Sequence, residues 1–546
     1  MSRQDLQARS ESDQMQTIAF DYIIVGAGSA GCVLADRLST CGRHSVLVLE
    51  AGGSDRRFWI KVPVGYAVNY ANPALNWGYR TDAEEALNGR ACYWPRGRVI
   101  GGSSSINAMA YVRGLSHDFD DWAAAGATGW DWKTVRDVYG RMETRSDGSG
   151  GGPVWVQDLS DQMNPFSKHF LAAAREAGHA TPDDMNAEGA EGLSYYRSNV
   201  RGGLRWSAAD AFLRPALKRR NVTLRTQAHV MALQFEGARA SGLHYERQGK
   251  IVRVEARREV ILSAGAISSP QLLQLSGIGP ADLLRRHGIE VRRDLPQVGE
   301  GLQDHLAVSY QFRATQTTLN AILGSHFGRI GAGLRYALTR RGPLAVPVNQ
   351  VGGFVRSHAQ ARGPDMQLFC NPASYEVTPE GKVVIDRASG YLLSAQPSRP
   401  TSRGHVRIRS ADHRDTPAIR PNSLATQEDR DAAIRGGRIL QELAKTPALA
   451  AVSSGCKIAG FETMDADALL DEFRARASTV FHPTCTCRMG NDDSDSVADA
   501  RLRVHGVPGL RVVDASSFPN ITSGNTNAPT MMLAMRAADL ILGDAR

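Results

Sequence analysis

The sequence predicts an α/β protein built around a Rossmann-like, dinucleotide-binding sheet, and three observations near its start carry that prediction. An apolar stretch at residues 20–25 runs into the pattern G-x-G-x-x-G at residues 26–31. An amphipathic segment, residues 32–38, follows, and then a second apolar stretch, residues 45–50. The second stretch ends in an acidic residue, Glu50. This order of strand, glycine-rich turn, helix, strand and acid is typical of a dinucleotide-binding βαβ unit.

Each glycine of this unit has a physical role. Gly26 permits the tight turn, Gly28 lets the backbone approach a pyrophosphate, and Gly31 lets the helix pack close to the strand. The pyrophosphate would lie at the helix N-terminus, where free N–H groups and the helix dipole favour negative charge. Glu50 would accept hydrogen bonds from a ribose diol. The glycines alone also suit an ordinary turn, but the complete unit predicts a redox enzyme.

Two further segments rich in glycine and serine, residues 96–114 and 263–280, each read as a loop that feeds a helix. Such loops offer backbone N–H groups to a phosphate or a polar ring. Each segment alone is equally compatible with a tight turn and a capped helix start, as at Ser268 before Pro270.

Together these two segments resemble the two signature segments of the glucose–methanol–choline (GMC) family of flavin oxidoreductases. The resemblance continues through residues 76–79 and 298–305 and from 481 to 543, so it covers nearly the whole chain. It implies FAD rather than NAD as the cofactor, and the oxidation of an alcohol as the activity. It also implies a second, α+β domain for the substrate, with an antiparallel sheet flanked by helices.

The resemblance implies which residues bind FAD. They come from the N-terminal unit, the two signature segments and the C-terminal region. We expect this set to be Gly26, Gly28, Ser29, Ala30, Gly31, Glu50, Ala51, Trp77, Arg98, Gly101, Gly102, Ser103, Asn107, Ala108, Val230, Ala264, Asp514, Ala515, Asn525 and Thr526. Some choline oxidases attach the flavin covalently through a histidine in the first signature. Ile106 stands at that position here, which predicts non-covalently bound FAD.

The C-terminal region carries the residues expected to perform the chemistry. Residues 510–514 read as a buried strand, and the chain from Pro529 onward reads as a helix that would place Asn525 beside the flavin. Alcohol oxidation needs a base for the hydroxyl proton while hydride leaves carbon for flavin N5, and histidine titrates near neutral pH. The family motif implies His482 as this general base and Asn525 as the amide that hydrogen-bonds the substrate oxygen. Because asparagine does not titrate, His482 would carry the proton transfer alone.

Two neighbouring features invite other interpretations. His482, Cys485 and Cys487 form H-x-x-C-x-C, which lacks the two separated pairs of a zinc site, so we expect these cysteines to pack and no metal to bind. His305 ends a motif that resembles a turn near the cofactor, and we expect it to be structural.

The cofactor-binding elements lie at both ends and in the middle of the chain, which predicts a discontinuous domain. The FAD-binding domain is assigned residues 19–119, 196–310 and 478–546, and the substrate-binding domain residues 120–195 and 311–477. Residues 1–18 are polar and mixed in charge, and we expect a disordered tail there. Within the substrate domain, residues 366–370 read as a strand over the flavin face. Phe58, Trp59, Val62, Val64 and Tyr66 would form a lid or channel wall, unless they are core.

Composition narrows the function further. The net charge is +8, but the arginines are spread without the basic stripe or known module of a nucleic-acid-binding protein. No run approaches the roughly 20 apolar residues that span a bilayer, and no secretory signal is present. Seven cysteines without framework spacing favour a reducing cytoplasm. The basic surface is compatible with peripheral binding to anionic lipid at the inner membrane face.

Substrate and electron acceptor follow from the resemblance alone. Residues 186–193 and 206–215 resemble bacterial choline-, sorbose- and aliphatic-alcohol-dehydrogenase-like members, which implies a primary alcohol going to an aldehyde. Electrons would pass to quinone or another carrier. The alternatives are an alcohol oxidase that reduces O2 to H2O2, a hydroxynitrile lyase on the same fold, and a catalytically silent flavoprotein.

Overall fold

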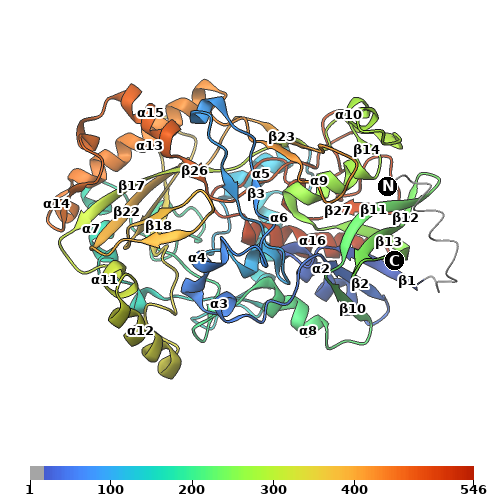
Figure 1. Ribbon diagram of the computed structural model, residues 1–546, viewed down its shortest axis with the longest axis horizontal. Coiled ribbons are helices and arrows are strands. Elements are labelled where there is room, and N and C mark those ends of the chain that lie inside the picture. Colours follow the sequence, from blue (N-terminus) through green and yellow to red (C-terminus); the bar gives the residue numbers. More distant parts are fainter. Residues whose placement is uncertain (1–17, 546) are drawn as a thin grey trace.

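A computed structural model describes residues 18–545, and two seven-stranded sheets lie side by side in it (Figure 1). The first sheet is mixed: its strands pair in parallel except β12 and β11, which pair antiparallel. In spatial order its strands are β10 (Val222–Thr226), β2 (Val46–Glu50), β1 (Ile18–Val25), β13 (Lys250–Leu262), β12 (Arg239–Arg247) and β11 (His229–Glu236), with β27 (Leu510–Val512) also beside β13.

Helices cover both faces of the first sheet, which explains why β1 and β2 are almost continuously apolar. Tyr22 and Ile24 of β1 pack toward α2 (Ser29–Ser39) and α16 (Asn527–Asp544). Alternate residues of the same strands pack on the opposite face, against α9 (Gly265–Leu275). The predicted strand–turn–helix–strand unit and the α/β fold class are therefore confirmed. The C-terminal helix begins at Asn527, slightly before the predicted Pro529.

The second sheet is antiparallel throughout. In spatial order its strands are β25 (Ser453–Cys456), β17 (Leu306–Ala314), β22 (Gly390–Pro397), β19 (Met366–Asn371), β18 (Val351–Val355) and β7 (Gly192–Tyr195), with β26 (Ser478–Thr479) also beside β17. One face packs against α7 (Ser167–Glu176), α13 (Gln427–Lys445), α14 (Pro447–Ala450) and α15 (Ala466–Arg476). The antiparallel sheet flanked by helices is thus present, and residues 366–370 lie in β19.

Shorter elements connect and surround the sheets. They are α3 (Phe58–Lys61), α4 (Tyr66–Asn69), β3 (Tyr79–Arg80), β4 (Tyr93–Trp94), α5 (Ser116–Ala124), α6 (Trp132–Met142), β5 (Glu143–Arg145), β6 (Val154–Val156), β8 (Val200–Arg201), β9 (Leu204–Arg205), α8 (Arg214–Ala216), β14 (Ile278–Gly279), α10 (Ala281–Arg286), β15 (Arg293–Asp294), β16 (Glu300–Leu302), α11 (Leu319–Leu323), α12 (His326–Thr339), β20 (Tyr375–Val377), β21 (Val383–Ile385), β23 (Gly404–Arg407) and β24 (Ala418–Arg420). Within residues 18–545, no helix combines the length and the apolar content needed to cross a bilayer.

Two strands of the second sheet lie partly or wholly in residues that the predicted boundaries assign to the other domain. β17 starts at Leu306 and β26 covers Ser478–Thr479, so both strands begin inside segments that the sequence assigns to the FAD-binding domain. Of the tail predicted at residues 1–18, Ile18 is the first residue of β1, and the others lie outside the described residues.

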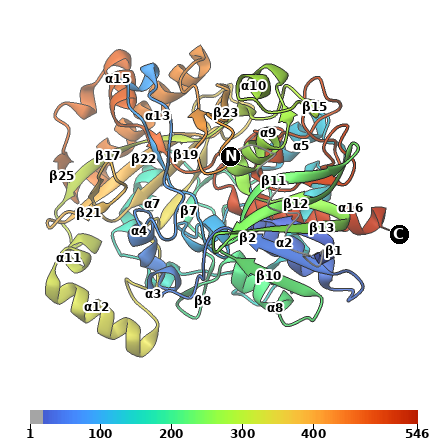
Figure 2. The same ribbon diagram turned by 45° about the vertical axis from the view of Figure 1, so that its right-hand side comes forward.

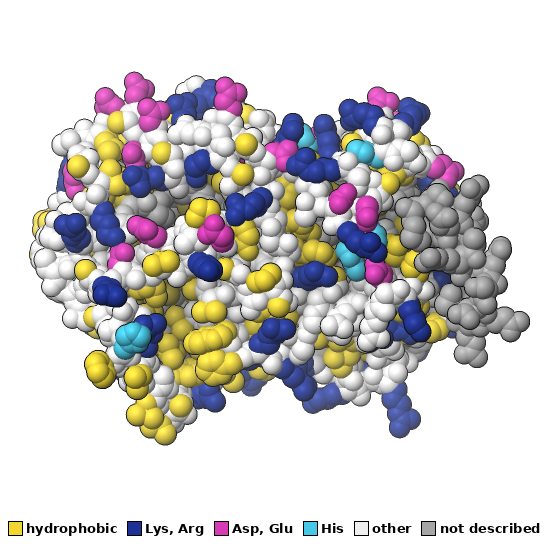
Figure 3. Space-filling model, in the orientation of Figure 1, with side chains coloured by type: hydrophobic (Ala, Val, Ile, Leu, Met, Phe, Trp, Pro, Cys, Tyr) yellow, Lys and Arg dark blue, Asp and Glu magenta, His cyan; other side chains and the backbone are white. Residues whose placement is uncertain are grey.

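The helical pair α11 and α12 projects from the edge of the molecule near α3 and α4 (Figures 1 and 2). Tyr336 of α12 packs with Val62 and Ala345, which joins this projection to the segment between α3 and α4. The space-filling view shows apolar side chains gathered over this region, at its lower left (Figure 3).

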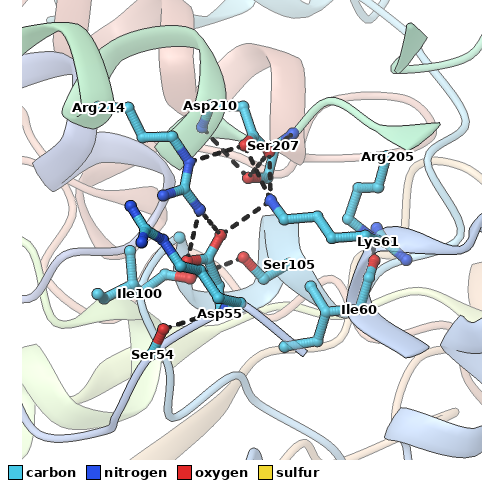
Figure 4. Close-up of polar contacts among 12 residues, drawn as sticks. Ser54, Asp55, Ile60, Lys61, Ile100, Ser105, Arg205, Ser207, Asp210 and Arg214 are labelled. Atoms are coloured by element: carbon cyan, nitrogen blue, oxygen red, sulfur yellow. Dashed lines mark hydrogen bonds and ion pairs between the residues drawn. The ribbon is translucent and has the colours of Figure 1, made fainter. Parts of the chain in front are cut away.

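A polar network fastens the segment after β2 to the π-helical turn Ala209–Leu213 (Figure 4). The buried carboxylate of Asp55 accepts hydrogen bonds from Lys61 Nζ at 3.0 Å and Arg214 Nη2 at 2.6 Å. Lys61 and Arg214 also bond Asp210. Burial alone would raise the pKa of Asp210, but Lys61 and Arg214 lower that pKa overall. The network therefore holds four charged groups together and fixes the position of α3.

Candidate active site

A cavity of about 1880 Å³ has walls from both sheets. Its floor includes Val25 and Leu49, at the carboxyl ends of β1 and β2. Ligands of open α/β sheets bind outside the carboxyl ends of the strands, where βα loops meet. The cavity continues from this edge past His482 to the polar face of the second sheet.

The glycines of the dinucleotide loop meet different surroundings. A Cβ at Gly26 would lie 2.5 Å from the Ser263 carbonyl oxygen, and the residue has φ +102°. A Cβ at Gly31 would lie 1.9 Å from the Gly26 carbonyl oxygen, so this glycine allows the helix to pack on the strand. A Cβ at Gly28, which lines the cavity, would meet nothing closer than 3.9 Å. Protein packing therefore does not require a glycine at position 28, and this residue is accessible to a ligand in the cavity.

The first signature segment lies directly over this loop. A Cβ at Gly102 would lie 2.7 Å from the Gly28 Cα, so only glycine permits this approach. Arg205, which is buried, holds the segment from below: its Nη1 donates to the Ser104 carbonyl at 3.1 Å and to Asn107 Oδ1 at 2.7 Å. Burial lowers the pKa of Arg205 to about 10. Sequence reasoning missed Arg205, since nothing local in the chain indicates a contact 98 residues away.

Glu50 ends β2 in the cavity wall. Its Oε2 accepts the Ala27 N–H at 2.9 Å, and its Oε1 accepts the Gly52 N–H at 2.8 Å. Burial raises the pKa of Glu50 to about 7. Each carboxylate oxygen keeps a second lone pair, so the group retains the capacity to accept ribose hydroxyls.

Two helix N-termini converge at the floor. Ser29 at the start of α2 donates from Oγ to Asn527 Oδ1 at the start of α16, over 2.7 Å. Free N–H groups and both helix dipoles favour an anion there. With the uncrowded Gly28, the spare lone pairs of Glu50 and the length of the cavity, these residues fit an FAD.

Most predicted cofactor residues line the cavity. They are Gly26, Gly28, Ser29, Ala30, Glu50, Ala51, Trp77, Gly102, Ser103, Asn107, Ala108, Val230, Ala264, Asp514, Ala515, Asn525 and Thr526. Gly31, Arg98 and Gly101 lie behind its wall instead. Gly31 packs against the turn, the Arg98 guanidinium lies 4.8 Å from the Trp77 ring centre, and the Gly101 N–H donates to the Ala27 carbonyl at 2.7 Å. These three support the loops that face the cavity.

The predicted base, His482, is buried in the cavity wall between two side chains. Its Nδ1 lies 3.0 Å from Nδ1 of His305, and its Nε2 lies 3.2 Å from Nδ2 of Asn525. Strand pairing brings the two histidines together: His305 precedes β17, His482 follows β26, and Leu306 pairs with Thr479. The structure thus joins His482 and Asn525, as the motif implies, and adds His305.

The hydrogen bonds define which nitrogen of His482 carries the hydrogen and which carries the lone pair. His305 Nε2 lies 3.0 Å from the Ser398 carbonyl, which only accepts, so Nε2 carries the hydrogen. Burial lowers the pKa of His305 to about 4, so the ring is neutral and its Nδ1 accepts. His482 Nδ1 must then donate to it. The lone pair of neutral His482 is therefore on Nε2, which faces Asn525 and the cavity.

The charge state of His482 follows from its surroundings. Burial, then His305 and Arg96, hold its pKa well below the ordinary 6.5, so the ring is neutral at pH 7. Asp304 fixes its backbone by accepting the His482 N–H at 2.7 Å. Arg96 donates to the carbonyl of Phe481, which has a left-handed φ of +71°. The loop therefore holds a neutral, oriented imidazole.

The two cysteines of the H-x-x-C-x-C pattern pack on opposite sides. Cys485 lies in the apolar cluster with α2 and α16, whereas Cys487 lies in the cluster with α9. Burial raises the pKa of Cys485 to about 11, so it is a protonated thiol at neutral pH. No group of three His, Cys, Asp or Glu side chains in residues 18–545 is arranged to hold a metal ion.

The second sheet supplies an uncharged polar wall opposite the cofactor loops. The wall residues from β17 and β19 include Ser309, Gln311, Gln367, Phe369 and Asn371. The carboxylates among the described residues of the cavity wall are Glu50, Glu376, Asp415 and Asp514, and none belongs to β17, β19 or β22.

The aromatic segment after β2 forms the other side of the cavity. Phe58, Trp59, Val64 and Tyr66 line it, and Phe58 and Trp59 are 61% and 43% exposed. Val62 is buried with Tyr336 instead. Phe58, Trp59 and Val64 therefore form channel wall and Val62 is core, whereas Tyr66 both lines the cavity and packs in a buried cluster.

Comparison with known proteins agrees with this geometry. Two family models, both described as GMC oxidoreductase, match residues 20–307 and 400–534. An oxygen-dependent choline dehydrogenase from Photobacterium profundum is 40% identical over 539 residues, which cover 96% of this chain and 93% of the relative. An alcohol dehydrogenase [acceptor] from Pseudomonas putida is 40% identical over 532 residues, 96% of each chain.

A solved structure extends the comparison to three dimensions. The crystal structure of pyridoxine 4-oxidase from Mesorbium loti is 31% identical and has a TM-score of 0.86, covering 95% of this chain and 98% of that chain. Both the sequence and the architecture are shared over nearly the full length. The chain therefore belongs to the GMC oxidoreductase family, and it is an FAD-dependent oxidoreductase that oxidises alcohols.

Proposed function

We propose that this enzyme oxidises an uncharged primary alcohol to an aldehyde, with His482 as the general base and Asn525 as the group that orients the substrate oxygen. The observation that supports this most directly is the lone pair of His482 Nε2, which accepts a hydrogen bond from the Asn525 amide at the junction of the cofactor loops and the polar wall. A substrate hydroxyl that bridges the two groups would replace this hydrogen bond, donating its proton to Nε2 and accepting from Nδ2.

His305 acts through His482 in this proposal. By accepting from Nδ1, it keeps the lone pair on Nε2 and holds the ring orientation while the proton arrives. FAD bound in the cavity supplies the acceptor for the hydride that leaves the carbinol carbon. We infer that it is held without a covalent bond, since Ile106 stands where a histidine linkage would form.

The uncharged wall supports a neutral substrate. Some relatives are named choline dehydrogenases, and a quaternary ammonium is recognised by aromatic rings together with a carboxylate. Tyr66, Tyr70 and Tyr375 line the cavity, but the strands β17, β19 and β22 place no carboxylate opposite His482. An aliphatic or aromatic alcohol carries no charge, so it contacts this wall without the desolvation cost that a quaternary ammonium would incur.

We propose quinone or another lipophilic carrier as the electron acceptor, because Phe58, Trp59 and Val68 make the cavity edge apolar. The cytoplasm is the proposed compartment: the seven cysteines are all free, as in proteins of reducing compartments. Reduction of O2 to H2O2 is the alternative for the second half-reaction.

The decisive test is anaerobic mixing of the purified yellow protein with a panel of neutral primary alcohols, followed by readmission of air. We expect bleaching of the flavin absorbance with at least one alcohol and slow reoxidation in air that an added quinone accelerates. Fast reoxidation in air would identify an oxidase. Flavin that no alcohol bleaches, together with cyanide release from a cyanohydrin, would replace the proposal by a lyase.

A further inference from the structure

The ridge formed by α12 exposes an apolar stripe. Phe327, Ile330, Leu334 and Leu338 are 90%, 68%, 62% and 77% exposed. Their spacing follows the helical repeat, so the four side chains lie on one face. Ala332 and Tyr336, on the opposite face, are the buried residues of the helix. The stripe therefore points directly away from the body of the protein.

Further exposed apolar residues continue this surface toward the cavity. Phe58 and Trp59 of α3 and Val68 of α4 are 61%, 43% and 51% exposed, and all three line the cavity. Arg329 and Gly333 of α12 line it too. We call these seven apolar residues the rim surface: Phe58, Trp59, Val68, Phe327, Ile330, Leu334 and Leu338. Figure 3 shows apolar side chains gathered over this part of the molecule.

The chain segment that contains α12 carries basic side chains and no acidic ones. No Asp or Glu occurs between Asp304 and Asp365, a stretch that contains the whole of α12. Arg335 lies beside the apolar stripe on the helix, whereas Arg329 lies on the other side, toward the cavity. Arg340 and Arg341 follow the helix, and Arg341 forms an ion pair with Asp161. Long arginine side chains beside an apolar stripe reach phosphate headgroups while their stems stay in the apolar layer.

We propose that the rim surface docks on a bilayer that contains anionic lipid, with the stripe of α12 in the interface and the neighbouring arginines on the headgroups. An exposed apolar patch of this kind marks an interaction surface. The arginines complement an anionic membrane, whose negative surface potential attracts basic residues. The helix projects as a convex ridge (Figures 1 and 2), a shape that enters a lipid layer without a matching groove.

Docking would place the edge of the cavity at the lipid. An apolar electron carrier could then reach the cavity without crossing water, a consequence that rests on the proposed function. The docking itself does not, because it needs only the rim surface and the arginines.

The test is sedimentation of the flavin-loaded full chain with vesicles, read as protein in the pellet. One set of vesicles is phosphatidylcholine alone and the other contains phosphatidylglycerol as well. The fourfold variant Phe327→Ser, Ile330→Ser, Leu334→Ser, Leu338→Ser removes the stripe, and Leu217→Ser, at another exposed leucine, is the matched control. Flavin content and alcohol oxidation verify that each variant is folded.

We expect the wild type and Leu217→Ser to bind the anionic vesicles, and the fourfold variant to lose about tenfold or more in affinity. Arg335→Gln should weaken binding to anionic vesicles and leave binding to neutral ones unchanged. A wild type that stays in the supernatant, or a fourfold variant that binds like the wild type, would overturn the proposal. Light scattering that shows a wild-type dimer and a monomeric variant, without vesicle binding, would instead assign the surface to a second copy of the chain.

Discussion

At the scale of single residues, the proposed proton transfer depends on one nitrogen atom, Nε2 of His482. In the proposed mechanism, His482 Nε2 acts as the base because His305, which donates to the Ser398 carbonyl, accepts the hydrogen of His482 Nδ1. The sequence predicts His482 and Asn525 from the family motif, but it predicts only a structural role for His305. The partnership is invisible in the sequence because 177 residues separate the two rings.

His482→Ala should slow flavin reduction by about two to four decades, the usual contribution of a general base. FAD should remain bound, since the cofactor contacts lie on other residues. Stopped-flow absorbance under anaerobic conditions measures the rate. Unchanged reduction kinetics would remove His482 from the chemistry.

His305→Ala should lower the reduction rate by about tenfold to a hundredfold, a typical effect of losing the partner that orients a functional histidine. The loss should appear in kcat rather than KM, because His305 is placed to act on His482. His305→Gln, which keeps a hydrogen-bonding side chain, should recover part of the rate. Equal losses in both variants accompanied by loss of bound flavin would indicate a merely structural residue.

The pH dependence follows from the pKa of His482. Its protonated form is no base, and burial holds its pKa well below 6.5. His482 should therefore stay unprotonated as the pH falls from 8 to 6.5. The rate of flavin reduction should begin to fall through protonation of His482 only below this pH. The limiting reduction rate at saturating alcohol is the quantity to follow. A reduction rate that already falls at pH 7 would show that a group other than His482 causes the loss.

At the scale of elements, the loop after β1 separates packing from binding. Gly28→Val should give a folded protein without FAD, because its Cβ has room among protein atoms but occupies the place of the pyrophosphate. Gly31→Ala should instead destabilise the fold, because its Cβ would lie 1.9 Å from a carbonyl oxygen. Flavin absorbance and thermal unfolding of both variants distinguish the two effects. A fully yellow Gly28→Val protein would contradict the cofactor assignment.

The network under α3 makes a second prediction at this scale. Asp55→Ala leaves Lys61 and Arg214 without their buried partner, which costs about 2–4 kcal/mol, below the full range for a buried pair because both cations are partly exposed. Urea unfolding measures the loss. Asp147→Ala, at an exposed carboxylate, is the control and should change stability by less than about 0.5 kcal/mol.

The elements that the sequence predicts best are those with local signals. β1, α2 and β2 follow from apolar periodicity and three glycines within about thirty residues. Arg205 under the first signature and the pairing of β17 with β26 have no local signal, because each joins distant parts of the chain. The motif resemblance suggests His482 as the base, whereas only the strand pairing reveals that His305 lies beside it.

At the scale of the whole molecule, both sheets contribute walls to the cavity. The wall from the second sheet is uncharged, and this limits which alcohols bind well. We expect 3,3-dimethylbutan-1-ol, a neutral analogue of choline with the same shape, to have a kcat/KM about tenfold or more above that of choline. The physical reason is that a quaternary ammonium loses its hydration at this wall without gaining a carboxylate. Steady-state rates with both compounds test this prediction, and a preference for choline would show that a carboxylate outside these strands, such as Glu376 in the cavity wall, contacts the substrate.

The position of the two histidines beside the pairing of β17 with β26 has a consequence for how such enzymes diversify. The proposed base and its partner are anchored at one end of the second sheet, whereas the polar wall lies farther along β17 and on β19 and β22, with the α3 segment on the other side of the cavity. Substitutions in that wall change which alcohol fits without moving His482. Directed evolution of this protein toward new alcohols should therefore find its productive mutations on those strands and leave the imidazole pair untouched.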